Sequence, residues 1–193
     1  VGFMPLVDMA YQGFGTGLDE DAYGLRLLAA SGENMIVCSS CSKNFGLYRE
    51  RVGAVLVIAK DRQQADISRG QLLSIARGIY SMPPNHGAAL VDIIVNDALL
   101  RQQWETELTD MRERIIQLRI QLVSKLQAAG AGSRFDYIQA EKGMFSFLGI
   151  TPEQVQRLKQ EHSIYMVNSS RISVAGLSSQ NMDYVVASLM QTL

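Results

Sequence analysis

Short apolar runs of strand length alternate with stretches of helical length through the first half of the chain. The apolar runs cover residues 3–10, 34–39 and 52–59, and helices are predicted over 19–31, 61–78 and 86–95. Strands this short and apolar, separated by helices, predict an α/β fold with a mostly parallel sheet that is buried on both faces. Such sheets bind ligands at the carboxyl ends of their strands, where Asp8 and the loop that starts at Ser40 lie.

One predicted helix is much longer than the others. Apolar residues recur at steps of three or four from Leu100 to Leu126, which predicts one continuous helix over 97–129. Asn96 is suited to cap its amino terminus, and Gly130 is suited to end it. A helix of this length is expected to link two lobes. A coiled-coil arm is the alternative, although the charges do not flank the apolar face in pairs.

The last third of the chain has a different pattern. Thr151-Pro152-Glu153-Gln154 has the spacing of a capping box with proline at the first helical position, so a helix begins there. Strands are predicted over 143–148, 164–168 and 171–175, and a last helix over 179–192. Together these elements predict a small α+β lobe. The expected division is 1–96 for part of a large domain, 97–129 for the linking helix and 130–193 for the small domain.

Composition excludes several classes of partner. The chain has 18 basic and 19 acidic residues and a net charge of −1, which gives no electrostatic reason to expect nucleic acid or an anionic membrane. No apolar run approaches the roughly 20 residues that span a bilayer. The sequence begins directly on apolar residues without an initiator methionine, so we expect it to be a piece of a larger fold.

Two short motifs have weak functional interpretations. Cys38 and Cys41 form a Cys-x-x-Cys pair, which is a redox dithiol, half a zinc site, or simply two small buried residues at a strand end. The last interpretation is favoured because Cys38 lies on an apolar strand and no second cysteine pair exists; free thiols favour a cytoplasmic setting. Glycines at 13, 15 and 17 suggest a dinucleotide loop, but their spacing differs from that fingerprint.

The loop between the second and third strands has the chemistry of a cofactor site. Lys43 follows the hydroxylated residues Ser40 and Ser42 and precedes Arg51. Hydroxyl and guanidinium groups are suitable ligands for a phosphate. A lysine in cationic surroundings can become nucleophilic toward an aldehyde, as a Schiff-base lysine must be. A solvated surface lysine is the alternative for these residues taken alone.

Five blocks of sequence carry a resemblance to a known family. They are Asp8–Phe14, Ser40–Gly53, Arg77–Pro84, Gly143–Phe147 and Arg171–Gly176. In order and nearly in spacing they resemble the pyridoxal-phosphate-dependent aspartate and aromatic amino acid aminotransferases of fold type I. The resemblance extends over almost the whole chain. It implies the carboxy-terminal portion of such an enzyme, with pyridoxal 5′-phosphate as cofactor and no metal.

The resemblance also implies a role for each cofactor-binding residue. Lys43 matches the catalytic lysine that holds the cofactor covalently and then moves the proton. Asp8 matches the carboxylate that pairs with the pyridinium nitrogen and keeps the ring protonated. Tyr11 matches the phenol that hydrogen-bonds the ring oxygen. Ser40 and Arg51 match ligands of the phosphate.

Three further residues match groups that contact the substrate. Arg171 matches the arginine that binds the α-carboxylate through two parallel hydrogen bonds. Arg77 matches an arginine that reaches across the interface of a homodimer to the side-chain carboxylate of dicarboxylic substrates. Phe145 matches an aromatic residue near the substrate, although it fits the core of the small lobe equally well.

The sequence departs from the family pattern at single positions and in its extent. Cys41 replaces a usual aromatic residue, Met82 stands where aspartate-type members often have asparagine, and Ser170 replaces a usual glycine. In the family an amino-terminal half supplies a phosphate loop and the aromatic residue that stacks on the cofactor. Those segments have no counterpart here, so the chain alone is expected to be inactive.

The expected function is transfer of an amino group between an aromatic or acidic amino acid and a 2-oxo acid such as 2-oxoglutarate. A lyase of the same fold would share the cofactor residues, but it would not need Arg77. A non-enzymatic regulator with an aminotransferase-like domain is the other alternative. The net charge gives no support to a DNA-binding role.

Overall fold

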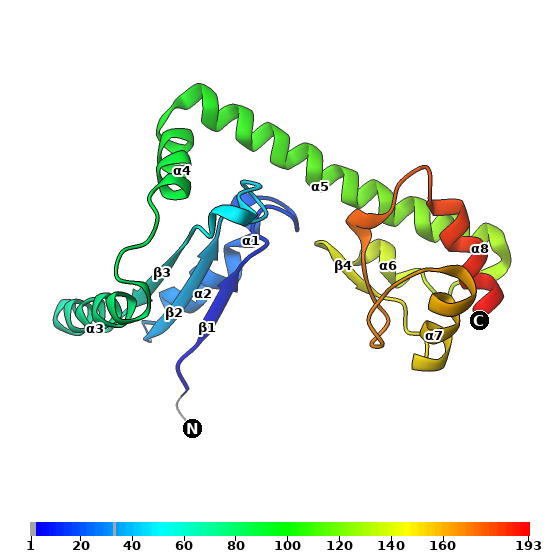
Figure 1. Ribbon diagram of the computed structural model, residues 1–193, viewed down its shortest axis with the longest axis horizontal. Coiled ribbons are helices and arrows are strands. Elements are labelled where there is room, and N and C mark those ends of the chain that lie inside the picture. The colour runs from blue at the N-terminus through cyan, green and yellow to red at the C-terminus, as the bar shows by residue number, and fades with distance from the viewer. Residues whose placement is uncertain (1–2, 33) are drawn as a thin grey trace. The chain divides into compact units, whose positions relative to one another are not determined.

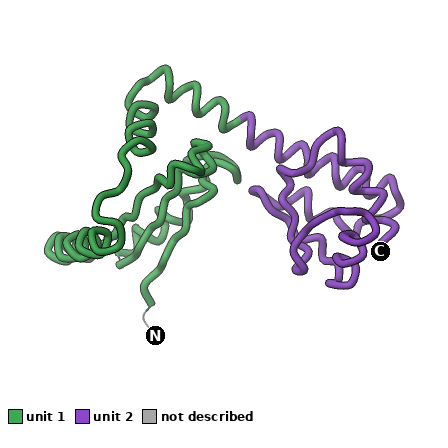
Figure 2. The backbone as a smooth tube through the Cα atoms, viewed as in Figure 1, with its two compact units in different colours: residues 1–109 green, residues 110–193 purple. Residues whose placement is uncertain are grey.

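The computed structural model describes residues 3–32 and 34–193. The chain forms two compact units, residues 1–109 and 110–193, whose boundary lies inside one long helix (Figure 2). No helix among the described residues is both long and apolar enough to cross a membrane. The finer division at residues 96 and 129 stays a prediction.

Unit 1 contains a three-stranded sheet. Its strands are β1 (Leu6–Met9), β2 (Met35–Ser40) and β3 (Gly53–Ile58), in the order β1-β2-β3. β1 and β2 are parallel, with Asp8 opposite Cys38. β2 and β3 are antiparallel because the loop between them turns the chain back at the same edge. The α/β class is confirmed, and β3 makes the described sheet mixed.

One face of this sheet is well covered. Helix α1 (Leu18–Asp21) leads through Ala22 into α2 (Tyr23–Ala30), which lies along the sheet (Figure 1). The buried cluster consists of Met9, Ala22, Met35 and Val37. The prediction that the sheet is buried on both faces is wrong for β3. Val55 and Leu56 are neighbours in this strand and are 55% and 52% exposed. The helix next to β3, described below, leaves a pocket between itself and the strand instead of a packed layer.

Three helices follow β3. They are α3 (Arg62–Tyr80), α4 (His86–Asn96) and α5 (Ala98–Leu126). The predicted long helix is confirmed in α5, although its amino-terminal cap is Asp97 and not Asn96. Asp97 accepts hydrogen bonds from the backbone N–H groups of Leu99 and Leu100, whereas Asn96 is the last residue of α4. A π-helical turn at Gln127–Ala131 follows α5, and Gly130 there has a φ of 97°.

Unit 2 packs a small sheet against helices. It contains α6 (Tyr137–Ala140), β4 (Phe145–Phe147), α7 (Pro152–His162), β5 (Arg171–Ser173), a 3₁₀ turn at Val174–Gly176 and α8 (Met182–Thr192). Strands β4 and β5 are antiparallel. The capping box at Thr151 is confirmed. The apolar face of α5 is buried here at Ile115, Leu118, Leu122 and Leu126.

The strand predicted at 164–168 is wrong. Its residues alternate between half-buried Ile164 and Met166 and exposed Tyr165 and Val167, as in a strand. No described segment forms a ladder with it, however, and a β-strand is defined by a hydrogen-bonded neighbour. Alternation alone therefore identified an extended segment and not a sheet member.

Candidate active site

Asp8 and Lys43 come from neighbouring parallel strands at the same edge of the sheet. Asp8 lies at the end of β1, and Lys43 lies in the loop after β2, which pairs with β1 in parallel register. One carboxylate oxygen of Asp8 accepts a hydrogen bond of 3.0 Å from the backbone N–H of Ala10. Asp8 is otherwise exposed, so its side chain can receive a further donor.

The ammonium group of Lys43 lies over two aromatic rings. Its Nζ is 4.5 Å from the ring centroid of Tyr11 and 5.1 Å from that of Tyr48. Ring faces attract a cation without neutralising it. Within residues 3–32 and 34–193, no carboxylate comes within ion-pair distance of Lys43. The half-buried amine is thus oriented yet available, and Tyr48 is a neighbour that the sequence did not indicate.

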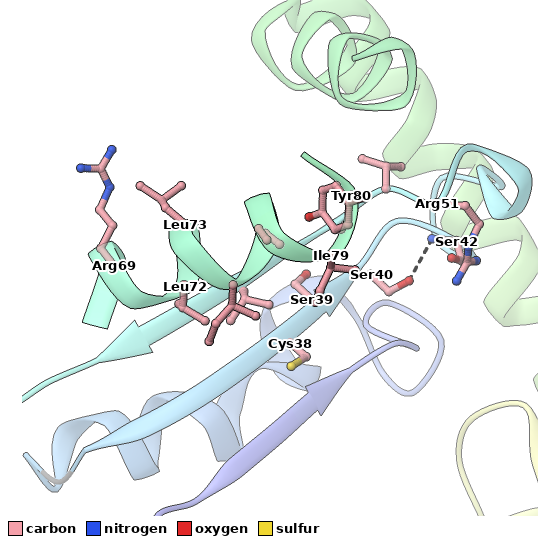
Figure 3. A pocket seen from close by; sticks show the side chains of 16 residues that line it. Cys38, Ser39, Ser40, Ser42, Arg51, Arg69, Leu72, Leu73, Ile79 and Tyr80 are labelled. Carbon is pink, nitrogen blue, oxygen red and sulfur yellow. Dashed lines mark hydrogen bonds between the residues drawn. The ribbon is translucent and has the colours of Figure 1, made fainter. Parts of the chain in front are cut away.

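Ser40, Ser42 and Arg51 lie together where β2 ends (Figure 3). The hydroxyl of Ser40 accepts a 3.2 Å hydrogen bond from the backbone N–H of Ser42. Arg51 has a left-handed backbone with φ 53°, and its Nη1 donates to the carbonyl of Tyr48 at 3.2 Å. Hydroxyl and guanidinium donors gathered in one place suit a phosphate.

These phosphate-type donors form one end of a pocket of about 660 Å³ between α3 and strands β2 and β3. Its walls are mainly apolar, with Leu72, Leu73 and Ile79 on the helix side (Figure 3). Lys43, Asp8 and Tyr11 do not line it. The cavity therefore overlaps the predicted site only at its phosphate end.

Trp104 of α5 fixes the residues that follow Lys43. Its indole Nε1 donates a 2.7 Å hydrogen bond to the carbonyl of Asn44, and its ring stacks on Phe45 with centroids 4.2 Å apart. The Asn44 side chain also donates to the carbonyl of Gln12 at 3.4 Å. The sequence indicated Trp104 only as part of an apolar helical face. Its role in the loop depends on a contact 60 residues away, which no local pattern reveals.

Asp21 occupies the glycine loop that resembled a dinucleotide motif. Its carboxylate accepts hydrogen bonds of 2.8, 2.9 and 2.8 Å from the backbone N–H groups of Gly13, Gly15 and Thr16. These N–H groups would otherwise bind an external anion, so the loop is closed to a phosphate. Gly13 has φ 96° and packs so tightly on Leu108 that a Cβ would lie 2.5 Å from its Cδ2. The loop thereby orders the chain just after Tyr11.

Asp21→Asn is expected to destabilise the protein most at neutral pH. Burial raises the pKa of Asp21, but the backbone N–H groups outweigh this effect and leave the pKa below 3.8. The stabilisation is therefore fully present at pH values well above 3.8 and is lost as the pH falls through 3.8 and then through the lowered pKa. We expect a loss of about 1–3 kcal/mol at pH 7.

Chemical denaturation of the whole protein at pH 7 and at pH 3 measures this difference. The control is Asp19→Asn, because Asp19 forms an exposed ion pair with Arg26, and removing such a pair should cost at most about 1 kcal/mol. An equal loss for Asp21→Asn at both pH values would show that the charge of the carboxylate is unimportant.

The surroundings of the two cysteines favour a packing role over a reactive one. Cys38 lies on β2, and Cys41 donates its backbone N–H to the carbonyl of Val52 at 3.1 Å. Burial raises the pKa of the Cys41 thiol, which is the opposite of what a reactive thiolate needs. Both cysteines are free.

Arg77 lies in the last turn of α3 and is exposed. The helix ends at Ser81, whose φ of 64° turns the chain, and Met82 is 81% exposed. An exposed guanidinium at the end of a helix is available to a ligand or to another subunit. Within unit 1 it is not among the residues that line the pocket.

Arg171 and Phe145 meet inside unit 2. The guanidinium carbon of Arg171 lies 4.7 Å from the ring centroid of Phe145, and both residues line a second cavity of about 550 Å³. Ser170 has a left-handed φ of 63°, which explains why glycine suits this position. Its buried hydroxyl accepts a 3.1 Å hydrogen bond from the backbone N–H of Gly149. This bond offsets the strain of a non-glycine residue.

The structure thus groups five predicted residues in unit 1 and two in unit 2. Asp8, Tyr11, Ser40, Lys43 and Arg51 cluster around the carboxyl ends of β1 and β2 and the loop that follows, and Arg171 and Phe145 form a pair in the other unit. Their roles stay predictions. The sequence analysis assigned no role in the site to Asp21, Tyr48 or Trp104, each of which orders a cofactor-type residue or its loop.

Comparison with known proteins identifies the family. The model of the aminotransferase class I and II family matches residues 1–189, and the chain belongs to this family. It is 52% identical over 192 residues to an aspartate aminotransferase of Haemophilus influenzae, covering 100% of this chain and 48% of that protein. It is 47% identical over 188 residues to an aromatic-amino-acid aminotransferase of Pseudomonas aeruginosa, covering 97% of this chain and 47% of that protein.

Solved structures agree with this assignment. An aromatic-amino-acid aminotransferase of Burkholderia pseudomallei, covalently bound to pyridoxal phosphate, matches with a TM-score of 0.95 and 44% identity over 98% of this chain and 48% of that chain. An aromatic amino acid aminotransferase with 3-indolebutyric acid also has a TM-score of 0.95, with 42% identity over 99% of this chain and 48% of that chain. The chain spans about half the length of the curated relatives it matches.

Proposed function

We propose that the whole protein is a pyridoxal-phosphate-dependent aminotransferase that acts on aromatic or acidic amino acids with 2-oxoglutarate. The observation that carries the proposal is the half-buried Lys43 amine, which lies over Tyr11 and beside the end of the strand that holds Asp8. A solved relative is covalently bound to pyridoxal phosphate, and relatives include aspartate and aromatic-amino-acid aminotransferases.

The residues in unit 1 fit this cofactor. When bound, pyridoxal phosphate supplies an electron-accepting ring that stabilises negative charge at the substrate α-carbon. Lys43 provides an amine for covalent attachment, and the exposed carboxylate of Asp8 provides a partner for a protonated ring nitrogen. Tyr11 provides a phenol for the ring oxygen. Ser40 and Arg51 provide hydroxyl and guanidinium donors for the phosphate, and the Ser42 N–H holds the Ser40 hydroxyl in place.

Different side chains of the protein would then perform the proton transfer and the binding of the substrate carboxylate. Lys43 would act as a positioned amine that accepts the proton leaving the substrate α-carbon and then gives it up again, which is general acid–base catalysis. Trp104 and the Tyr11 and Tyr48 rings restrict where that amine can move. Arg171 would hold the substrate α-carboxylate with two parallel hydrogen bonds. A cytoplasmic homodimer with shared active sites is part of the proposal.

Amino transfer by the whole protein tests the proposal directly. Tyrosine or aspartate with 2-oxoglutarate should yield glutamate, with turnover in the usual enzymatic range of about 1–1,000 per second. A lyase would release products without forming glutamate, and a regulator would form neither. Because the relatives are about twice as long, we expect the 193-residue chain alone to show little or no turnover. Full turnover by the verified short chain would refute that expectation.

Arg77→Ala is expected to change substrate preference. Only dicarboxylic substrates would lose a charge-assisted pair, which is worth about 1.5–3 kcal/mol, so kcat/KM for aspartate should fall roughly ten- to hundredfold more than for tyrosine. Steady-state kinetics of the whole protein measure both. Arg62→Ala is the control, because Arg62 lies on the same helix with a 96% exposed side chain. Equal losses for aspartate and tyrosine would assign Arg77 a structural role.

A further inference from the structure

Arg119 is a buried cation in unit 2 that no sequence motif indicated. It lies on α5, is 1% exposed, and points at the segment that leads into β4. Its Nη2 donates hydrogen bonds of 2.7 Å to the carbonyls of both Gly143 and Phe145. Its Nη1 donates to the carbonyl of Ile138 at 3.2 Å and to the hydroxyl of Ser146. A buried arginine with this many acceptors must fix their positions, since losing any of them leaves polar groups unpaired.

These contacts lie along the edge of β4 that is opposite β5, where no other described strand pairs with it. The carbonyls of Met144 and Ser170 bond across the β4–β5 ladder, accepting from Val174 at 2.8 Å and from Leu148 at 3.0 Å. Since the backbone alternates along a strand, the carbonyls of Gly143, Phe145 and Phe147 point to the other edge. Arg119 binds the first two, and the Tyr137 hydroxyl donates to the third at 2.6 Å. Side chains thus provide hydrogen-bond donors for these three carbonyls on the free edge of β4.

The edge contacts lead directly to the Arg171 guanidinium. Phe145 pairs with Ser173, and Phe147 pairs with Arg171 in the ladder. The Phe145 ring lies 4.7 Å from the guanidinium carbon of Arg171. Arg119 therefore binds the backbone of Phe145, the residue on which Arg171 stacks. Phe145 belongs to β4, the strand that pairs with β5 and so fixes the position of Arg171.

We propose that Arg119 is a positioning residue for carboxylate recognition: by binding the free edge of β4 it sets Phe145, and Phe145 sets the direction of the Arg171 guanidinium. The inference rests on the proposed function, in which Arg171 binds the substrate carboxylate. Arginine suits this task because its planar fork donates in fixed directions from two nitrogens, whereas lysine offers one rotatable ammonium. Two parallel hydrogen bonds to a carboxylate tolerate little rotation, so a small tilt of Arg171 weakens binding.

The test measures carboxylate affinity at matched stability. Calorimetry on the cofactor-loaded whole protein gives the dissociation constant of 3-phenylpropionate, a carboxylate without an amino group, for the wild type and for Arg119→Lys, Arg119→Met and Tyr137→Phe. The matched control is Val155→Ala in α7, which removes fully buried apolar atoms of the same unit at a position outside both strands. Arg171→Leu reports whether Arg171 binds the probe at all.

We expect the dissociation constant to rise about tenfold in Arg119→Met, less in Arg119→Lys and Tyr137→Phe, and less than twofold in Val155→Ala. If Arg119→Met does not fold, the two milder variants carry the test. Affinity changes no larger than those of Val155→Ala would overturn the inference while leaving the proposed function intact. Unchanged affinity in Arg171→Leu would instead contradict the role of Arg171 in the proposed function and the inference with it.

Discussion

Lys43→Ala is expected to lower turnover of the whole protein by about 10²–10⁴-fold or more, because the variant loses the general acid–base group that a positioned amine supplies. Lys43→Arg should lower turnover almost as much. It keeps a positive charge over Tyr11 and Tyr48, but a guanidinium neither attaches to an aldehyde nor gives up its proton. Comparing the two variants therefore separates the chemistry of the amine from its charge.

Steady-state kinetics and bound pyridoxal phosphate are measured together for this prediction. Lys60→Ala is the matched control, because Lys60 is an exposed lysine of the same unit at the end of β3. It should retain wild-type turnover. Near-normal turnover in Lys43→Ala would remove Lys43 from the mechanism.

Arg171→Leu is expected to lower kcat/KM to a similar extent for every amino acid and 2-oxo acid substrate. All of them present an α-carboxylate, and losing a pair of charge-assisted hydrogen bonds costs about 3 kcal/mol or more, which is a fall in kcat/KM of at least about a hundredfold. This uniform loss contrasts with the result expected for Arg77→Ala, in which kcat/KM should fall mainly for dicarboxylic substrates.

The same unit offers a control of the same geometry. Arg134 lies over the ring of Phe135 at 5.5 Å, as Arg171 lies over Phe145 at 4.7 Å. Arg134→Leu should leave kcat/KM within about twofold. A loss in Arg171→Leu that equals the loss in Arg134→Leu would mean that Arg171 serves packing and not recognition.

Elements with local signals could be predicted from the sequence. The capping box at Thr151, the long apolar face of α5 and the position of Asp8 at a strand end each depend on residues within a few turns or one strand. The segment around Lys43 was predicted from hydroxyl, amine and guanidinium groups that lie close together in sequence, together with the resemblance of this segment to the family. The structure places Ser40, Ser42 and Arg51 together at one end of a pocket.

Features that depend on distant contacts could not be predicted. Asp21 is one of three acidic residues in the first turn of α1, and only the fold brings the glycine N–H groups to its carboxylate. Arg119 sits beside Leu118 on an apolar face, where a charge is unexpected until its carbonyl partners are known. The direction of β3 and the missing ladder at 164–168 likewise depend on neighbours that the local pattern does not specify.

Covalent trapping of the cofactor tests the central claim most directly. The whole protein is incubated with pyridoxal phosphate, reduced with borohydride and digested, and the modified lysine is located by mass spectrometry. We expect a single pyridoxyl group on Lys43, within the segment Ser40–Gly53. A label on Lys60 or Lys142 in place of Lys43 would contradict it.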